Sequence, residues 1–143
     1  MTAAVQYGRG GVSSPDDAWR AWGDDPWELN VLVIVNDQPY GSERPYNALR
    51  LAGALSKREG VELRLFLLGD AVSCAVAGQQ LAEGHYHLDR MIKPLVRRGQ
   101  VAVCGTCMDA RGLREKQLVE GAGRSNLEDL TDWTMWSDKT LVF

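Results

Sequence analysis

The chain has few cysteines, no long apolar run and no excess of basic residues, and each shortage excludes a class of protein. Three cysteines in 143 residues, two of them three positions apart, do not fit a secreted disulfide framework. No apolar stretch approaches the roughly 20 residues of a membrane span, and the first residues lack the pattern of a secretory signal. The net charge of -3 offers no basic surface for nucleic acid. We expect a cytoplasmic protein with reduced or transiently oxidised thiols, without membrane or direct nucleic-acid contacts.

Two regions of the chain differ in composition. Residues 1–27 contain scattered glycine, serine and proline with few aliphatic residues, which predicts an N-terminal tail that is partly flexible. Residues 28–143 alternate between apolar runs and amphipathic stretches, and their length suits one domain with a core of its own. We therefore expect a tail followed by one folded domain.

The apolar run 29–35 is rich in β-branched residues and predicts a strand buried on both faces. Similar patterns predict strands at 61–68, 100–104 and 140–143, and residues 118–121 fit either a short strand or a turn. Helices are expected between these strands. They are a helix capped by Ser42, one at 71–77, one at 86–98 kinked by Pro94, one starting at Arg111, and one capped by Ser125 that runs to about Ser137 with Leu127, Leu130, Trp133 and Thr134 facing inward. Strands separated by helices indicate parallel pairing and a three-layer α/β sandwich.

Ligand sites in open parallel sheets lie beyond the carboxyl ends of the strands. Two loops then carry the candidate residues. One follows the first strand and contains Asp37, Tyr40, Gly41 and Ser42, and the other runs from Cys104 to Arg111 after the third strand. We expect both loops at the same sheet edge, where they build one pocket that favours an anionic thiolate or persulfide.

Cys104 and Cys107 form a C-x-x-C pair at the end of a strand. Cys104 fits a nucleophile or sulfur carrier, whose thiolate the following helix start and Arg111 would favour, or a small buried apolar residue. Cys107 fits a resolving thiol that forms a disulfide with Cys104 or accepts sulfur from it. No second such pair completes a zinc site, and His85 and His87 are poorly spaced to do so, so we predict no metal.

Other residues keep two interpretations each. Arg111 fits an anion-binding residue or a surface arginine, and Asp37 fits a general acid or base or a turn cap. Cys74 lies among small apolar residues and is expected in the core. The basic cluster predicts a solvated helix face, or a surface for an acidic partner; it comprises Arg90, Lys93, Arg97 and Arg98.

Three segments of the chain form a recognisable combination: Asn36-Asp37-Gln38-Pro39-Tyr40-Gly41-Ser42-Glu43, Leu65-Phe66-Leu67-Leu68-Gly69-Asp70-Ala71-Val72 and Cys104-Gly105-Thr106-Cys107-Met108-Asp109-Ala110-Arg111-Gly112. Together they resemble the DsrE/DsrF-like family, and in particular its YchN-like branch. Trp133-Thr134, Ser137-Asp138-Lys139 and Leu141-Val142-Phe143 are similar to that branch too, so the resemblance covers residues 28–143.

The resemblance implies a three-layer α/β/α domain with a parallel five-stranded sheet, assembled into homo-oligomers such as trimers or hexamers. It also implies sulfur handling. In sulfur-relay members the cysteine eight residues before the glycine of an Arg-Gly pair carries a persulfide, and here that position is Cys104. Cys107 is shared with the YchN-like branch and absent from the simplest carriers.

We therefore expect Cys104 and Cys107 to be catalytic, with Asp37, Tyr40, Gly41, Ser42 and Arg111 binding substrate. The expected function is that of a sulfur carrier, sulfurtransferase-like, which exchanges sulfane sulfur with donor and acceptor proteins and needs no cofactor. A thiol-disulfide redox protein and a non-catalytic oligomeric binding module are the alternatives.

Overall fold

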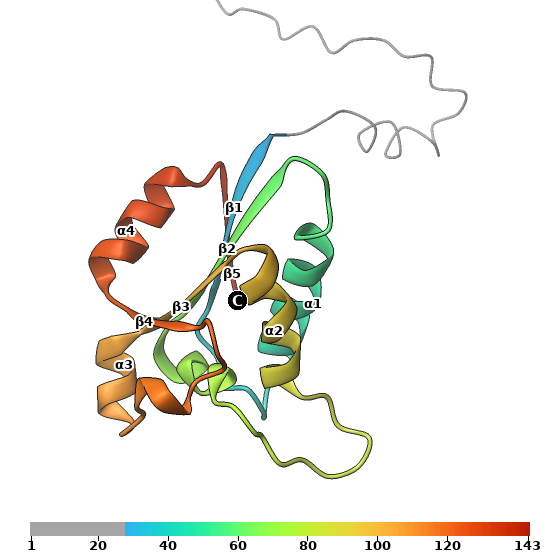
Figure 1. Cartoon of the computed structure of the whole chain (residues 1–143), viewed down its shortest axis with the longest axis vertical. Coiled ribbons are helices and arrows are strands. Elements are labelled where there is room, and N and C mark those ends of the chain that lie inside the picture. Colours follow the sequence, from blue (N-terminus) through green and yellow to red (C-terminus); the bar gives the residue numbers. More distant parts are fainter. Residues whose placement is uncertain (1–27) are drawn as a thin grey trace, which may run out of the picture.

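The computed structural model describes residues 28–143, and the predicted tail at 1–27 lies outside the described residues. Its centre is one sheet of five parallel strands in the order β4-β3-β2-β1-β5 (Figure 1). The strands are β1 (Leu29–Val35), β2 (Val61–Leu67), β3 (Gln100–Cys104), β4 (Gly123–Ser125) and β5 (Lys139–Val142). The expected parallel five-stranded α/β fold is confirmed.

Helices cover both faces of the sheet. The α-helices are α1 (Arg44–Leu55), α2 (Leu88–Arg98), α3 (Gly105–Ala110) and α4 (Leu127–Trp136), and two short 3₁₀ helices are η2 (Gly69–Ala75) and η3 (Glu115–Gln117). In Figure 1, α1 and α2 lie together on one side of the sheet and α4 lies on the other. Helix α3 and η2 lie at the end of the sheet where β2 and β3 finish, so the elements that follow these strands gather at one edge.

The central strands β1 and β2 carry buried apolar side chains on both faces of the sheet. Of the seven residues of β1, Val31, Leu32, Val33 and Val35 are buried, and β2 contributes Leu63 and the run 65–67. Apolar side chains on both faces of a strand require cover on both faces, which α1 and α2 provide on one side and α4 on the other. Trp133 of α4 meets Phe66 edge to face, with ring centroids 5.9 Å apart.

Several local predictions need correction. The C-x-x-C motif is not a loop, because α3 begins at Gly105, directly after β3. Residues 69–75 form a 3₁₀ helix instead of an α-helix at 71–77. The N-cap of α1 is Glu43, although the Ser42 hydroxyl still accepts a hydrogen bond from the Arg44 N–H at 3.1 Å.

The start of α4 also differs from the prediction. Ser125 ends the three-residue strand β4, and the helix is capped by Asn126, whose side-chain oxygen accepts the Asp129 N–H at 2.8 Å. Leu130 of α4 is buried and Trp133 is half-buried, whereas Leu127 is 72% exposed and Thr134 is exposed, so the expectation that Leu127 and Thr134 face inward is wrong. Leu127 fits the apolar pattern of an inward face, yet its side chain lies on the outer surface of α4.

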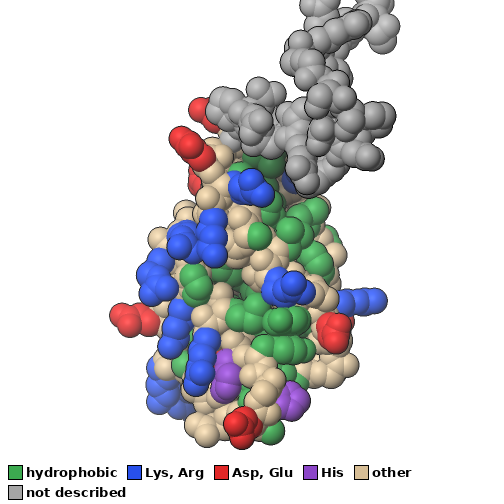
Figure 2. Space-filling view, turned by 90° about the vertical axis from the view of Figure 1, so that its right-hand side faces the viewer, with side chains coloured by type: hydrophobic (Ala, Val, Ile, Leu, Met, Phe, Trp, Pro, Cys, Tyr) green, Lys and Arg blue, Asp and Glu red, His purple; other side chains and the backbone are tan. Residues whose placement is uncertain are grey.

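Helix α2 carries the basic cluster of the sequence. All four of its members, Arg90, Lys93, Arg97 and Arg98, are exposed, which fits both a solvated face and a surface for an acidic partner. Figure 2 views the side of the molecule covered by α1 and α2 and shows Lys and Arg side chains along one margin of a central apolar area. No helix within residues 28–143 has the length and apolar character that crossing a membrane requires.

Candidate functional site

Cys104 ends β3 and caps the first turn of α3. Its sulfur accepts a hydrogen bond from the Cys107 backbone N–H at 3.4 Å, and this contact makes Cys104 the N-cap residue. The Cys107 sulfur in turn accepts the Gly69 N–H at 3.2 Å, which joins α3 to the start of η2, just after β2. Cys104 is 7% exposed and Cys107 is half-buried, so both thiols lie at the carboxyl edge of the sheet with limited access to solvent.

The two thiols interact directly. Burial raises the pKa of the Cys107 thiol above its ordinary value, and a hydrogen bond with the Cys104 thiol raises it further. The Gly69 N–H and the positive charge of Arg111 act in the opposite direction and do not cancel the rise. Cys107 is therefore a protonated thiol at neutral pH that lies against the sulfur of Cys104.

Arg124 lies beside Cys104, and no motif in the sequence indicated it. A Cβ atom placed on Gly105 would lie 2.8 Å from Cζ and Nε of Arg124, so this guanidinium packs against the residue that follows Cys104. Asp109 fixes it with two hydrogen bonds of 2.8 Å, which are the main cause of the raised pKa of Arg124, and Cys104 adds a smaller rise. The register of β3 and β4 explains the contact, because it pairs Cys104 with Ser125.

Arg111 lies beside the other thiol of the pair. Its Nη1 donates to the Cys107 carbonyl oxygen at 3.0 Å, and its Nη2 donates to the Asp70 carboxylate. The thiols are thus flanked by two arginine–aspartate pairs, Arg111 with Asp70 next to Cys107 and Arg124 with Asp109 next to Cys104. The sequence suggested Arg111 for Cys104, and the structure places its charge nearer to Cys107.

The loop after β1 reaches the same edge of the sheet. A Cβ on Gly69 would lie 3.6 Å from the Asn36 carbonyl oxygen, so the ends of β1 and β2 approach each other closely. Within the loop, the Ser42 hydroxyl donates to Asp37 at 2.9 Å, and the Arg44 guanidinium lies 3.6 Å from the same carboxylate. In the described part of the chain, the hydrogen bonds of Asp37 and Ser42 stay within this loop and do not reach Cys104.

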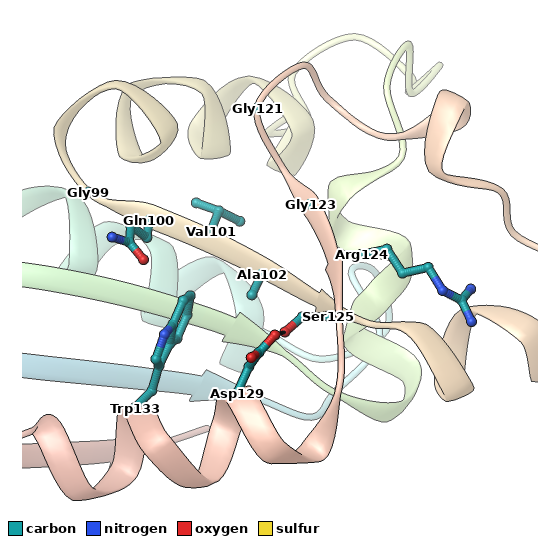
Figure 3. A pocket seen from close by; sticks show the side chains of 10 residues that line it. All are labelled: Gly99, Gln100, Val101, Ala102, Gly121, Gly123, Arg124, Ser125, Asp129 and Trp133. Carbon is teal, nitrogen blue, oxygen red and sulfur yellow. Dashed lines mark hydrogen bonds between the residues drawn. The ribbon is translucent and has the colours of Figure 1, made fainter.

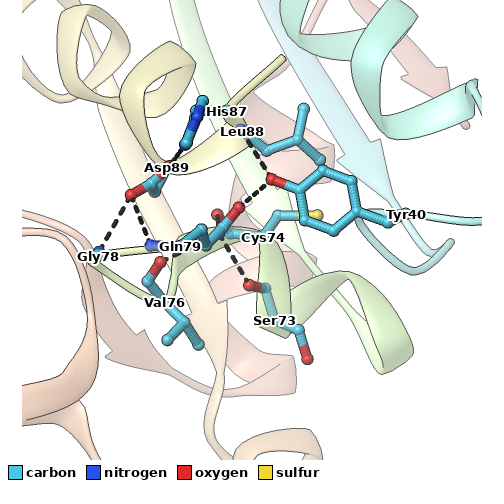
Figure 4. Close-up of polar contacts among 9 residues, drawn as sticks. All are labelled: Tyr40, Ser73, Cys74, Val76, Gly78, Gln79, His87, Leu88 and Asp89. Atoms are coloured by element: carbon cyan, nitrogen blue, oxygen red, sulfur yellow. Dashed lines mark hydrogen bonds and ion pairs between the residues drawn. The ribbon is translucent and has the colours of Figure 1, made fainter. Parts of the chain in front are cut away.

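Tyr40 belongs to a different polar network (Figure 4). Its hydroxyl donates to the Gln79 side chain and accepts the Leu88 N–H at 3.3 Å. The Gln79 amide also donates to three carbonyl oxygens in and next to η2. Asp89, which is 4% exposed, accepts the N–H groups of Gly78 and Gln79 and lies 3.9 Å from His87. These contacts pin the loop before α2 to η2.

The third cysteine belongs to the core. Cys74 has no exposed surface, and burial raises the pKa of its thiol to about 12. Within residues 28–143, no three side chains of the types that bind metals gather as a metal site would require.

A shallow groove of about 330 Å³ lies between β3, β4 and α4 (Figure 3). Its lining residues are Gly99, Gln100, Val101, Ala102, Gly121, Gly123, Arg124, Ser125, Asp129 and Trp133. Trp133 and Asp129 point from α4 toward the strands, and the Arg124 side chain points away from the groove, toward α3 (Figure 3). The groove therefore ends at Arg124 and Ser125, which also pack against Gly105.

Comparison with known proteins places this site in a family. A sequence profile described as the DsrE/DsrF-like family matches residues 30–143, from the second residue of β1 through β5. The chain belongs to the DsrE/DsrF-like family. Protein YchN of Escherichia coli is 40% identical over 115 residues, covering 79% of this chain and 97% of YchN.

Another relative and two solved structures also match this chain. An uncharacterized protein of Methanocaldococcus jannaschii is 38% identical over 115 residues, covering 80% of this chain and all of that protein. The crystal structure of E. coli YchN matches with a TM-score of 0.76 at 39% identity, over 80% of this chain and 99% of YchN. A protein of unknown function from Methanobacterium thermoautotrophicum matches with a TM-score of 0.63 at 12% identity, a likeness of fold alone.

Proposed function

We propose that this member of the DsrE/DsrF-like family is a sulfur carrier, in which Cys104 holds sulfane sulfur as a persulfide. The observation that carries the proposal is the position of the Cys104 sulfur. It lies at the carboxyl end of a central parallel strand, accepts the Cys107 N–H and lies near the guanidinium of Arg124. Hydrogen-bond donors and positive charge favour a sulfur anion, which is the reactive form of a thiol or persulfide.

The carrier cycle consists of two thiol exchanges. In the first, the Cys104 thiolate attacks the outer sulfur of a donor persulfide, and the donor thiolate leaves. In the second, an acceptor thiolate attacks the outer sulfur of the Cys104 persulfide, and Cys104 leaves as a thiolate. Sulfur moves as a neutral atom in each step, so the cycle uses no metal or organic cofactor. The low exposure of Cys104 limits the approach of thiols from bulk solvent to its sulfur.

Substrate contacts are proposed for residues at the same edge of the sheet. Arg111 lies beside Cys107, and the loop with Asp37, Gly41 and Ser42 follows β1, whose end approaches that of β2. Tyr40 lies in the same loop and contacts Gln79. A donor or acceptor protein that reaches Cys104 from this edge would meet these residues first.

Homo-oligomer formation, as a trimer or hexamer, belongs to the same proposal. Leu127 and Met135 are 72% and 82% exposed and lie eight residues apart on α4, which places them along one stripe of the helix. Val142 at the end of β5 adds another apolar side chain, 62% exposed. Large apolar side chains that are this exposed are typical of subunit interfaces when they form a patch, as the α4 stripe would.

Intact-mass analysis tests the carrier proposal. The full chain is incubated with a protein persulfide donor and compared with Cys104→Ser and with Cys74→Ser, which removes the buried thiol. Wild type and Cys74→Ser should gain about 32 Da, the mass of one sulfur atom, and Cys104→Ser should gain nothing. An unmodified wild-type mass, or an equal gain on Cys104→Ser, would contradict the proposal.

A thiol-disulfide redox function is the second candidate, and the placement of Cys107, whose backbone N–H donates to the Cys104 sulfur at 3.4 Å, favours it. Thiol trapping in redox buffers of defined potential tests it. A Cys104–Cys107 disulfide that forms and reduces in the range of cellular dithiols, about -180 to -270 mV, would support a redox role. A pair that stays reduced throughout that range would exclude it.

A further inference from the structure

Cys107 is a nucleophilic side chain that the carrier cycle does not use. One cysteine suffices to load and pass on a sulfur atom, because each exchange involves one thiol of the carrier. Yet the Cys107 N–H holds the Cys104 sulfur at 3.4 Å, and the Cys104 side chain is near enough to raise the pKa of the Cys107 thiol. The second thiol is therefore placed to react with whatever Cys104 carries.

Fixed contacts determine which sulfur atom Cys107 meets. The inner sulfur of a Cys104 persulfide is Cys104 Sγ itself, and the Cys107 N–H binds this atom. The Cys107 sulfur itself accepts the Gly69 N–H at 3.2 Å, which fixes its position. The outer sulfur of a persulfide is an added atom that extends beyond Sγ. The inner sulfur of the Cys104 persulfide is therefore the electrophilic atom that lies next to Cys107.

We propose that Cys107 discharges the Cys104 persulfide by attacking its inner sulfur, which releases the outer sulfur as sulfide. This inference rests on the proposed carrier function. The bond between the two persulfide sulfurs breaks, a Cys104–Cys107 disulfide forms, and the thiol proton of Cys107 leaves with the sulfide as HS⁻. The outer sulfur gains two electrons and the two cysteine sulfurs lose them, so the step needs no external oxidant. A dithiol reductant returns the pair to thiols before the next cycle.

The surroundings of Cys107 make this discharge dependent on pH. The titratable and charged groups that face it are the Cys104 thiol from β3 and Arg111 after α3, whose partner Asp70 lies in η2. The pKa of Cys107 is raised by burial and by Cys104, so its attacking thiolate is scarce at neutral pH and increases as the pH rises. A loaded carrier then persists at neutral pH long enough for an acceptor to compete with discharge.

A single-turnover experiment tests the inference on the full chain. Reduced wild type and Cys107→Ser are loaded with cysteine persulfide, freed of the probe by desalting, and followed by intact mass and by trapping of sulfide with monobromobimane. Wild type should lose the added mass of about 32 Da, end about 2 Da below the reduced chain and release about one sulfide per chain. Cys107→Ser should keep the added mass and release sulfide at least about ten-fold more slowly. Discharge of wild type should accelerate between about pH 7 and pH 8.5.

Three results would overturn the inference. Equal loss of the added mass by both proteins would show that Cys107 takes no part in the step. If peptide mapping found the added sulfur on Cys107 and no sulfide were released, Cys107 would have attacked the outer sulfur instead. A discharge rate independent of pH would show that the Cys107 thiolate is not the attacking group. Failure of the carrier function looks different, because Cys107→Ser would then never gain the mass. Cys107→Ala provides a second variant if the serine protein does not fold.

Discussion

Replacing Gly105 with alanine tests the packing that places Arg124 beside Cys104. The new Cβ would lie 2.8 Å from Cζ and Nε of Arg124 and 2.9 Å from the Ser125 carbonyl oxygen. Ordinary contacts between such atoms begin near about 3.5 Å, so the neighbours must retreat by about 0.6 Å. The Arg124 side chain can swing away. The Ser125 carbonyl cannot, because it belongs to the backbone of β4, which is paired with β3.

Gly53 provides a matched control for this substitution. It lies inside α1 with no atom within 4 Å of a Cβ, so Gly53→Ala should stabilise the helix by about 0.5–1 kcal/mol. Gly105 is also helical, and the difference between the two variants therefore isolates the cost of crowding, about 1–3 kcal/mol. At about 4 °C per kcal/mol for a domain of this size, the two variants should unfold about 4–12 °C apart.

Thermal unfolding followed by circular dichroism measures this gap on the full chain. Gly53→Ala should unfold above wild type, and Gly105→Ala well below Gly53→Ala. If both variants gain the same stability, the close approach of Arg124 and Ser125 to Gly105 is refuted, and with it the placement of the guanidinium beside the thiol.

Four further predictions concern single residues. Arg124 lowers the pKa of the Asp109 carboxyl, so the stabilisation from this pair is present above the usual carboxyl range and is lost as the pH falls through the lowered pKa; Arg124→Gln should return the Asp109 titration, followed by NMR, to its usual range. Cys74, with a pKa of about 12, should resist iodoacetamide at about pH 8 in the folded chain and react once denatured, and labelling of the folded chain would contradict its burial. Tyr40→Phe removes the acceptor of the Leu88 N–H and should lower the free energy of unfolding by about 1–3 kcal/mol, whereas an unchanged denaturant midpoint would show that the Tyr40 hydrogen bonds do not stabilise the fold. Met135→Asp should shift native mass spectra toward smaller assemblies, and unchanged subunit numbers would exclude α4 from the interface.

The parallel sheet and the place of its thiols follow from local patterns. The apolar run at 29–35 matches β1, and the bounds predicted for β3 agree with the structure. A strand that ends in Cys104 and belongs to a parallel sheet puts that thiol at the carboxyl edge without further information. Patterns of this kind are readable because burial on two faces demands continuous apolar residues.

Other features of the site depend on contacts between segments far apart in the sequence. Strand β4 has three residues and includes a glycine, so it has no pattern that separates it from a turn, and only pairing with β3 creates it. Arg124 therefore reaches Cys104 through register, whereas Arg111, close in sequence, faces Cys107.

The sequence alone determined that this chain forms a parallel α/β sheet with Cys104 at its edge, because strand periodicity and chain order are local properties. Which charges flank each thiol, and the raised pKa of Cys107, were decided by the tertiary structure. Electrostatic and desolvation effects act over a few ångströms in space, and the Gly69, Arg111 and Arg124 contacts that set them exist only after the strands have paired.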